Sequence, residues 1–302
     1  MKAAMIGLAA TIGLGAAIGV AAPVLAQDVP AAIFTDPPHD AAHPARMEVL
    51  HIPSGGAAIN GIAYVAAGAG PHPVVVLCHG LPGNEKNLDL AQALRRAGWT
   101  VITFNYRGSW GSPGSYRFAG DLQDADAVLA YLRDPAHAAA LGLDTRRVVM
   151  IGHSLGGWVT ALTAAHDKGL IGAALISPGN IGFIGHLPRA VAIKALDENG
   201  VEALADTNPT IMADEAIAQA DAFDFVRAAP KLTGAALLVL TSDDGLAPEA
   251  DKLVAGARAA GNAHVTSVHV ATDHGWSDRR IRLESEIIRW LAGLAGLAAW
   301  PR

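Results

Sequence analysis

The sequence of 302 residues has little cysteine, few aromatic side chains and no run of Lys or Arg. Its one cysteine, Cys78, excludes an internal disulfide, so the fold must be held together by its apolar core. With a formal net charge of −6 and no basic patch, nucleic acid is not an expected partner. The phosphate-binding pattern G-x-x-x-x-G-K-[ST] is also missing, and therefore no nucleotide cofactor is expected.

The first 26 residues differ in composition from the rest of the chain. Lys2 precedes a run of Ala, Gly, Ile and Leu, and residues 24–26 (VLA) provide the small side chains of a cleavage site. This pattern predicts a signal peptide at 1–26, cleaved near Ala26, and hence an exported protein that is periplasmic or secreted. A retained transmembrane anchor is the alternative, but the Gly and Ala content makes the run weakly hydrophobic, so no stable membrane anchor is expected.

From residue 46 onward, apolar patterns typical of strands and helices alternate. Residues 27–45 contain prolines and no apolar period, which predicts a linker or N-terminal arm. Strands are expected at 47–52, 59–66, 74–78, 100–106, 148–151, 173–177, 236–240 and 264–270. Helices are expected at 88–97, 121–133, 155–166 and 279–297. The alternation predicts one α/β domain over 46–302, with a mostly parallel central sheet flanked by helices.

Residues 178–232 interrupt this alternation. They contain helix-like patterns near 189–196 and 211–227 and no strand pattern. We therefore expect a helical insertion that forms a lid or cap over the functional edge of the sheet. An ordinary crossover helix is the alternative.

Ser154 lies where an apolar strand pattern changes into a helical one, within the letters GHSLGG at 152–157. A strand that turns sharply into a helix strains the backbone of the turn residue, and glycine neighbours avoid the collisions that side chains would cause. The serine then sits at the start of a helix, where negative charge is favoured. This pattern predicts a nucleophile, and a simple helix cap is the alternative.

A serine nucleophile needs a base, and the base needs an acid that orients it. Both candidates follow predicted strands: Asp243 and Asp244 come after 236–240, and His274 comes after 264–270. Because function collects at the carboxyl ends of parallel strands, we expect these side chains to meet Ser154.

Four other histidines compete with His274 for the role of base. His264 and His269 lie inside a strand pattern and are expected to be sheet residues. His79 and His153 flank the expected site, and we expect both to orient the backbone rather than to transfer protons.

These features resemble the α/β-hydrolase family. Residues 152–156 match its G-x-S-x-G nucleophile elbow, and Ser, acid and His follow in the family's order. Residues 78–83 (CHGLPG) and 105–111 (NYRGSWG) resemble its oxyanion loop and its Arg-Gly loop. The resemblance extends from about residue 46 to the C-terminus. It implies the α/β-hydrolase fold and a serine hydrolase that uses neither metal nor cofactor.

The resemblance also assigns roles to individual residues. It implies a triad of Ser154, His274 and an aspartate, with the backbone N–H groups of Leu81 and Leu155 as the oxyanion hole. Asp244 is favoured as the acid, because it lies four residues before a proline, as in the family's D-x-x-x-P turn. Asp243 is expected to cap the turn instead.

The substrate is less clearly indicated. Residues 80–87 and 105–109 resemble the small-esterase and prolyl-oligopeptidase-like branches of the family. We expect hydrolysis of a small-molecule ester; a peptidase or amidase acting on a short peptide is the alternative, and a non-catalytic binding protein is the third hypothesis. An aminopeptidase would need an acidic residue that binds the free amine of its substrate. The alternative is that the acidic residues of the insertion are solvated helix charges without such a role. The candidates for that role are Glu198, Glu202, Asp214 and Glu215.

Overall fold

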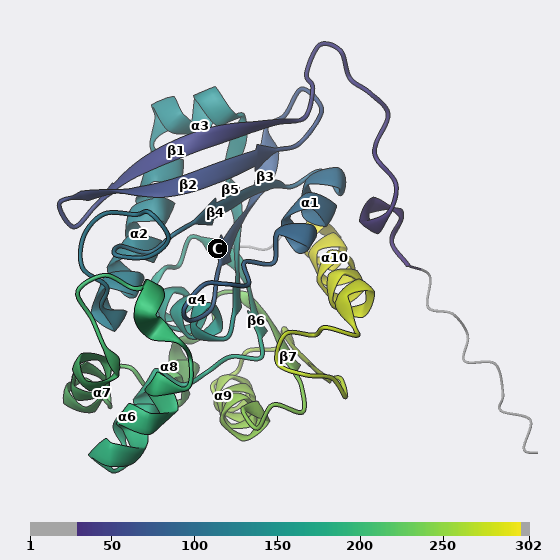
Figure 1. The fold of residues 1–302 in the computed structure, drawn as a ribbon. Helices are drawn as coiled ribbons and strands as arrows, with labels where there is room; N and C mark the ends of the chain where they lie inside the picture. The colour runs from purple at the N-terminus through teal and green to yellow at the C-terminus, as the bar shows by residue number, and fades with distance from the viewer. Residues whose placement is uncertain (1–28, 297–302) are drawn as a thin grey trace, which may run out of the picture.

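The computed structural model describes residues 29–296, so the predicted signal peptide lies outside the described residues. A sheet of eight strands crosses the molecule in the order β1-β2-β4-β3-β5-β6-β7-β8 (Figure 1). The strands are β1 (Arg46–Ser54), β2 (Ala57–Val65), β3 (His72–Cys78), β4 (Thr100–Phe104), β5 (Leu143–His153), β6 (Leu170–Ile176), β7 (Ala236–Thr241) and β8 (Val265–His269). The pairs β1–β2 and β2–β4 are antiparallel and the other five pairs are parallel, which confirms the mostly parallel sheet expected from the sequence.

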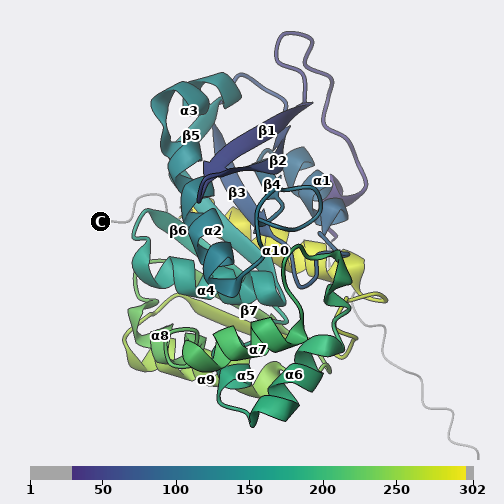
Figure 2. The same cartoon turned by 60° about the vertical axis from the view of Figure 1, so that its left-hand side comes forward.

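Ten α-helices are described, and they cover both faces of the sheet (Figure 2). They are α1 (Leu88–Arg96), α2 (Phe118–Arg133), α3 (Pro135–Leu141), α4 (Leu155–His166), α5 (Ile181–Gly185), α6 (Arg189–Asp197), α7 (Pro209–Ala218), α8 (Phe225–Ala228), α9 (Ala247–Ala259) and α10 (Arg280–Gly296). None of the helices within residues 29–296 is long and apolar enough to cross a bilayer.

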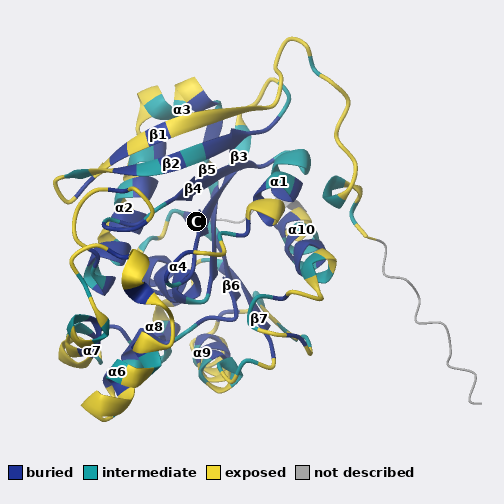
Figure 3. Ribbon diagram, viewed as in Figure 1, coloured by how far each residue is buried: buried dark blue, intermediate teal, exposed yellow. Residues whose placement is uncertain are grey.

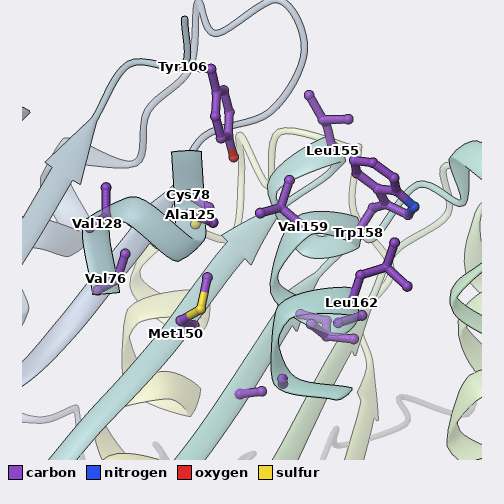
Figure 4. Close-up of a cluster of buried hydrophobic side chains, with 14 of the residues drawn as sticks. Val76, Cys78, Tyr106, Ala125, Val128, Met150, Leu155, Trp158, Val159 and Leu162 are labelled. Carbon is purple, nitrogen blue, oxygen red and sulfur yellow. The ribbon is translucent and has the colours of Figure 1, made fainter. Parts of the chain in front are cut away.

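Two apolar clusters, one on each face of the sheet, form the core. In β3, Val74 and Val76 belong to the cluster under α2, α4 and α9, whereas Val75 and Leu77 belong to the cluster under α1 and α10. A strand covered on both faces is apolar at every position, which explains the continuous apolar run of β3 and the fully buried β7 (Figure 3). Figure 4 shows the first cluster, in which Trp158 and its neighbours on α4 lie beside Cys78 and Met150 of the sheet.

Helix α3 was not expected from the sequence. Its seven residues, PAHAAAL, carry no amphipathic period, so the apolar pattern could not reveal them. The signal was at its start, where Asp134 accepts hydrogen bonds from the N–H groups of Ala136 and His137, and Pro135 occupies the first turn. After α3, strand β5 begins at Leu143, earlier than the expected position 148.

The chain between β6 and β7 contains helices and, in its described residues, no strand of the sheet. The helix expected over 211–227 is two helices, α7 and α8, because Asp224 starts a new helix by accepting a hydrogen bond from the N–H of Val226. Among the hydrogen bonds that attach this helical insertion to the domain, several involve helices α4 and α2. The indole N–H of Trp158 donates to the carbonyl oxygen of Phe223 at 2.6 Å, and the Glu215 carboxylate accepts from the first backbone N–H groups of α2.

Candidate active site

Ser154 occupies the sharp turn between β5 and α4, with φ of 57° and ψ of −119°. A non-glycine residue rarely adopts this backbone conformation, which is typical of functional turns. The neighbouring glycines permit close approach: a Cβ on Gly152 would collide with the carbonyl of Gly156, and one on Gly156 would collide with the carbonyl of Cys78. The glycines thus let strand, turn and helix pack tightly, and the strain is confined to Ser154.

His274 and Asp244 lie in direct contact after β8 and β7. The Nδ1–H of His274 donates to Oδ2 of Asp244 at 2.7 Å, and the Asp244 side chain is 5% exposed. Burial alone would raise the pKa of Asp244, but hydrogen bonds from His274, the Leu246 N–H and Ser242 outweigh it and lower the pKa to about 2. Asp244 is therefore ionised at neutral pH, and it holds the imidazole with Nε2 free to accept a proton.

Asp243, the alternative acid, does not cap the turn as expected, because the Leu246 N–H donates to Asp244 instead. The Asp243 carboxylate is exposed and lies 3.1 Å from Nε2 of His269. The aspartate in contact with His274 is thus Asp244. His269 lies in β8 as expected, whereas His264 lies one residue before the strand rather than inside it.

The loop that carries His274 lies against the turn at Ser154. The Nε2–H of His153 donates to the carbonyl oxygen of His274 at 2.8 Å, and the two rings lie 4.8 Å apart between centroids. Ser154 is partly exposed, and within the part of the chain that the structure describes its hydroxyl makes no hydrogen bond. In unliganded enzymes the bond between nucleophile and base is often long and tightens only when substrate binds.

The two residues whose backbone N–H groups are predicted to form the oxyanion hole lie near Ser154. Leu155 is the first residue of α4, and Leu81 follows Gly80, where an added Cβ would lie 3.1 Å from the Cβ of Ser154. Neither N–H donates to a backbone or side-chain acceptor within residues 29–296. Both therefore remain available to stabilise an oxyanion next to the serine.

His79 and His153 hold backbone carbonyls on either side of the serine. The Nδ1–H of His79 donates to the carbonyl oxygen of Gly80 at 2.7 Å, as His153 does to His274. Burial lowers the pKa of each histidine to about 4, so both rings are neutral at pH 7. These contacts agree with the expectation that both orient backbone.

The loop at 105–111 contacts the loop at 78–83. The Arg107 guanidinium donates from Nε to the buried carboxylate of Asp124 on α2 at 2.7 Å. Beyond it, the indole N–H of Trp110 donates to the carbonyl oxygen of Pro82 at 2.7 Å. The loop thus joins α2 to the residues that follow Leu81.

Cys78 is the other candidate nucleophile near the turn, and it is completely buried. Burial raises the pKa of its thiol to about 12, so no thiolate is present at neutral pH. Sequence reasoning missed a different residue, the buried Ser242, which helps to lower the pKa of Asp244. Its place in the turn after β7, two residues before the acid, was the available signal.

The acidic residues of the insertion have other partners or face solvent. Glu215 accepts from the N–H groups of Phe118 and Ala119 at 3.0 and 2.8 Å, and it caps α2. Both carboxylate oxygens of Asp214 accept hydrogen bonds from the Arg189 guanidinium. Glu198 lies 3.9 Å from Lys194, and Glu202 is exposed. No group of three or more possible metal ligands occurs among the described residues.

A cavity of about 650 Å³ lies at the opposite ends of the strands and contains none of the site residues. It is formed at the amino ends of β5, β6 and β7, and its lining includes Arg147, Lys168 and Thr233. Because ligands of open α/β sheets bind at the carboxyl ends of the strands, we place the site at Ser154 rather than in this cavity.

Comparisons with known proteins agree with this architecture. The carboxylesterase EstE1, cloned from a metagenomic library, superposes with a TM-score of 0.57 at 21% identity over 84% of this chain and 89% of its own. The acylaminoacyl peptidase of Pyrococcus horikoshii superposes with a TM-score of 0.64 at 15% identity over 82% of this chain and 41% of its own. Both likenesses show the shared fold.

Sequence comparison gives shorter matches to curated proteins and a long match to a family. An uncharacterized protein of Mycobacterium tuberculosis is 31% identical over 114 residues, which is 37% of this chain and 39% of that protein. The chain thus aligns with about two fifths of the length of this relative. The model of the alpha/beta hydrolase family matches residues 75–296, from β3 to the end of α10. The chain therefore belongs to the alpha/beta hydrolase family.

Proposed function

We propose that this protein is an exported serine hydrolase that cleaves carboxylic esters through an acyl-enzyme intermediate. The observation that carries the proposal is the 2.7 Å hydrogen bond between His274 and Asp244, in a loop that lies against the strained turn at Ser154. Membership of the hydrolase family and the fold shared with EstE1 support it.

In the proposed reaction, Oγ of Ser154 attacks the ester carbonyl while Nε2 of His274 takes its proton. The N–H groups of Leu81 and Leu155 stabilise the oxyanion, and Asp244 stabilises the imidazolium. The imidazolium then gives its proton to the leaving alcohol as the acyl-enzyme forms. Water, deprotonated by the same histidine, attacks the acyl group and releases the acid and the free serine.

The first experiment compares p-nitrophenyl esters of increasing acyl length with aminoacyl p-nitroanilides, using the protein from Gln27 onward. We expect ester turnover that is lost in Ser154→Ala, with little anilide cleavage. Preferred anilide cleavage would indicate the peptidase alternative, for which Glu215 and Asp214 offer no free carboxylate because both are already paired. Absence of turnover on every substrate would favour a binding protein.

Export rests on the sequence of residues 1–26 and needs its own test. We expect N-terminal sequencing of protein from the periplasm or medium of a bacterial host to begin at Gln27. Full-length chain retained in the membrane fraction would instead support the transmembrane alternative.

A further inference from the structure

Two side chains hold the carbonyl groups on either side of Leu81, whose N–H is the predicted oxyanion donor. The Nδ1–H of His79 donates to the carbonyl oxygen of Gly80 at 2.7 Å. The indole N–H of Trp110 donates to the carbonyl oxygen of Pro82 at 2.7 Å. His79 belongs to the same loop as Leu81, between β3 and α1, whereas Trp110 belongs to the loop after β4. Trp110 therefore connects the loop of Leu81 to a second part of the chain.

Trp110 meets the loop between β3 and α1 at another point, Lys86. The Lys86 ammonium lies 5.1 Å from the centroid of the Trp110 ring, a distance at which a cation is attracted to an aromatic face. The same ammonium donates to Oδ1 of Asn105 at 2.8 Å, and Nδ2 of Asn105 donates to the carbonyl oxygen of Trp110 at 2.9 Å. Each of these three residues contacts the other two, and we call the three together the indole clasp.

The chemistry of the groups in the indole clasp allows one arrangement of its hydrogen bonds. An ammonium group and an indole N–H only donate, and a backbone carbonyl oxygen only accepts. Asn105 therefore presents its amide oxygen to Lys86 and its amide nitrogen to Trp110, as the structure has them. The indole N–H remains for Pro82, so that no two donors or two acceptors face each other.

Gly83 lets the indole approach the backbone closely. Its φ of 104° lies in the left-handed region that favours glycine, and an added Cβ would lie 2.6 Å from Nε1 of Trp110 and 2.7 Å from Cε1 of His79. A side chain at this position would therefore collide with both rings. The backbone that follows Leu81 is thus enclosed between His79 and Trp110.

The loop that carries Trp110 is itself held on both sides. Before Trp110, the backbone N–H and Nε of Arg107 both donate to the buried carboxylate of Asp124 on α2, each at 2.7 Å. After it, Nδ2 of Asn60 on β2 donates to the carbonyl oxygen of Gly111 at 2.7 Å. The indole is thus presented from a loop that is attached to a helix and to the sheet.

Burial in the core does not explain Trp110. Its φ of 45° is a left-handed conformation, which a non-glycine residue adopts at a cost and which occurs frequently at functional sites. The residue is also 40% exposed, whereas the core tryptophan Trp158 is fully buried. Trp110 therefore gains less from apolar burial than a core residue does, and its distinctive contacts are those with Pro82 and Lys86.

We propose that Trp110 is a positioning residue, which through the indole clasp fixes the loop of Leu81 so that the Leu81 N–H is aimed at the developing oxyanion. This inference rests on the proposed serine hydrolase function. Preorganised donors stabilise a transition state because they need no reorientation during the reaction. In this role Trp110 touches no reacting atom, and its loss should lower kcat while substrate binding stays largely intact.

The experiment is the steady-state kinetics of ester hydrolysis by Trp110→Phe, which keeps an aromatic ring beside Lys86 and removes the indole N–H. We expect kcat to fall about tenfold and KM to change less than about twofold. Asn105→Ala removes the two hydrogen bonds of the clasp that involve Asn105 and should lower kcat by about threefold. It keeps the test open if Trp110→Phe folds poorly. An unchanged kcat in folded Trp110→Phe would overturn the proposal, whether or not KM rises.

Trp290→Phe is the matched control, because it makes the same substitution away from the loop of Leu81. Trp290 is a partly buried residue of α10, and its ring packs against Gly172 of β6. We expect its kcat to stay within about twofold of the unaltered protein. An equal loss of kcat in Trp290→Phe would show that the effect does not depend on the clasp, and the proposal would be wrong.

A second measurement needs no substrate and separates this inference from the proposed function. Trypsin cleaves after lysine, and it reaches Lys86 only when the loop opens locally. Cleavage after Lys86, followed by mass spectrometry, should be about tenfold faster in Trp110→Phe than in the unaltered protein or in Trp290→Phe. If Ser154→Ala retained activity, the proposed function would fail while this rate still decided whether the clasp holds the loop. Equal cleavage rates would overturn the clasp alone.

Discussion

The carboxyl ends of the strands and the helical insertion between β6 and β7 each hold a carboxylate that accepts hydrogen bonds, but the two carboxylates have different roles. At the strand ends, Asp244 receives hydrogen bonds from an imidazole and one backbone N–H. In the insertion, Glu215 receives two backbone N–H groups at the start of α2. The first carboxylate orients a titratable ring, whereas the second completes a helix.

The comparison separates residues that are expected to act in catalysis from residues that attach the insertion to the domain. Loss of a group at the strand ends should reduce turnover and leave most of the packing intact, because these side chains sit in turns. Loss of Glu215 should destabilise the fold and leave turnover largely intact, because its partners are the N–H groups of Phe118 and Ala119. Four predictions test this division.

The largest effect is expected at Ser154, the proposed nucleophile. Ser154→Ala should reduce kcat/KM for p-nitrophenyl acetate by about 10⁴-fold or more, because no acyl-enzyme can form. Thermal unfolding should be nearly unchanged, since the hydroxyl supports little packing. If purified Ser154→Ala remained active, another group would be the nucleophile. The division between catalytic and attaching residues would then be wrong at its main residue.

The next effect distinguishes two adjacent carboxylates at the strand ends. Asp244→Asn should lower kcat by about 10³- to 10⁴-fold, because the amide no longer stabilises the imidazolium or holds its tautomer. Asp243→Asn is the matched control and should retain activity within about threefold, since Asp243 contacts His269 at the surface. The reverse ranking of the two rates would contradict the assignment of the acid.

A moderate effect on stability is expected in the insertion. Glu215→Ala should lower the free energy of unfolding by about 1 to 2 kcal/mol, because two N–H groups of α2 lose a charged acceptor. Ester turnover should change by less than about threefold. Asp214→Ala, which removes an exposed ion pair with Arg189, serves as the control and should unfold at an unchanged temperature.

Denaturant unfolding with turnover measured on the same samples checks this prediction. A large loss of activity in folded Glu215→Ala would show that the insertion takes part in catalysis. It would also reopen the role of Glu215 in binding a substrate amine.

The smallest effect concerns pH. The pKa of Asp244 is lowered from 3.8 to about 2 in the folded protein, so its ionised form contributes stability above pH 4 that is lost as the pH falls toward 2. Discounted for solvent screening, this contribution is about 1 kcal/mol. The stability of the unaltered protein relative to Asp244→Asn should therefore fall by that amount between pH 5 and pH 2.5, as measured by denaturant unfolding. A difference that is constant with pH would show that the charge of Asp244 is not stabilised in the fold.

Several features of the fold could be predicted from the sequence because they depend on neighbours along the chain. Continuous apolar runs such as the one in β3 indicated buried parallel strands, and they were found. The glycines at 152 and 156 indicated a sharp turn at Ser154, and the structure has it. Helix α3 was not predicted, because an alanine-rich segment has no apolar period. Its capping residue, Asp134, could be recognised in the sequence.

The sequence by itself determined the alternation of strands and helices, the turn at Ser154 and the order of the candidate residues, since each follows from local composition and spacing. Only the tertiary structure decided which carboxylate faces His274, which N–H groups Glu215 caps, and which residues support Asp244. His153 contacts His274 across 121 positions, and Trp276 contacts Ser177 across 99. Contacts at such separations depend on which strands are neighbours in the sheet, and that order is a property of the whole packed domain rather than of any local pattern.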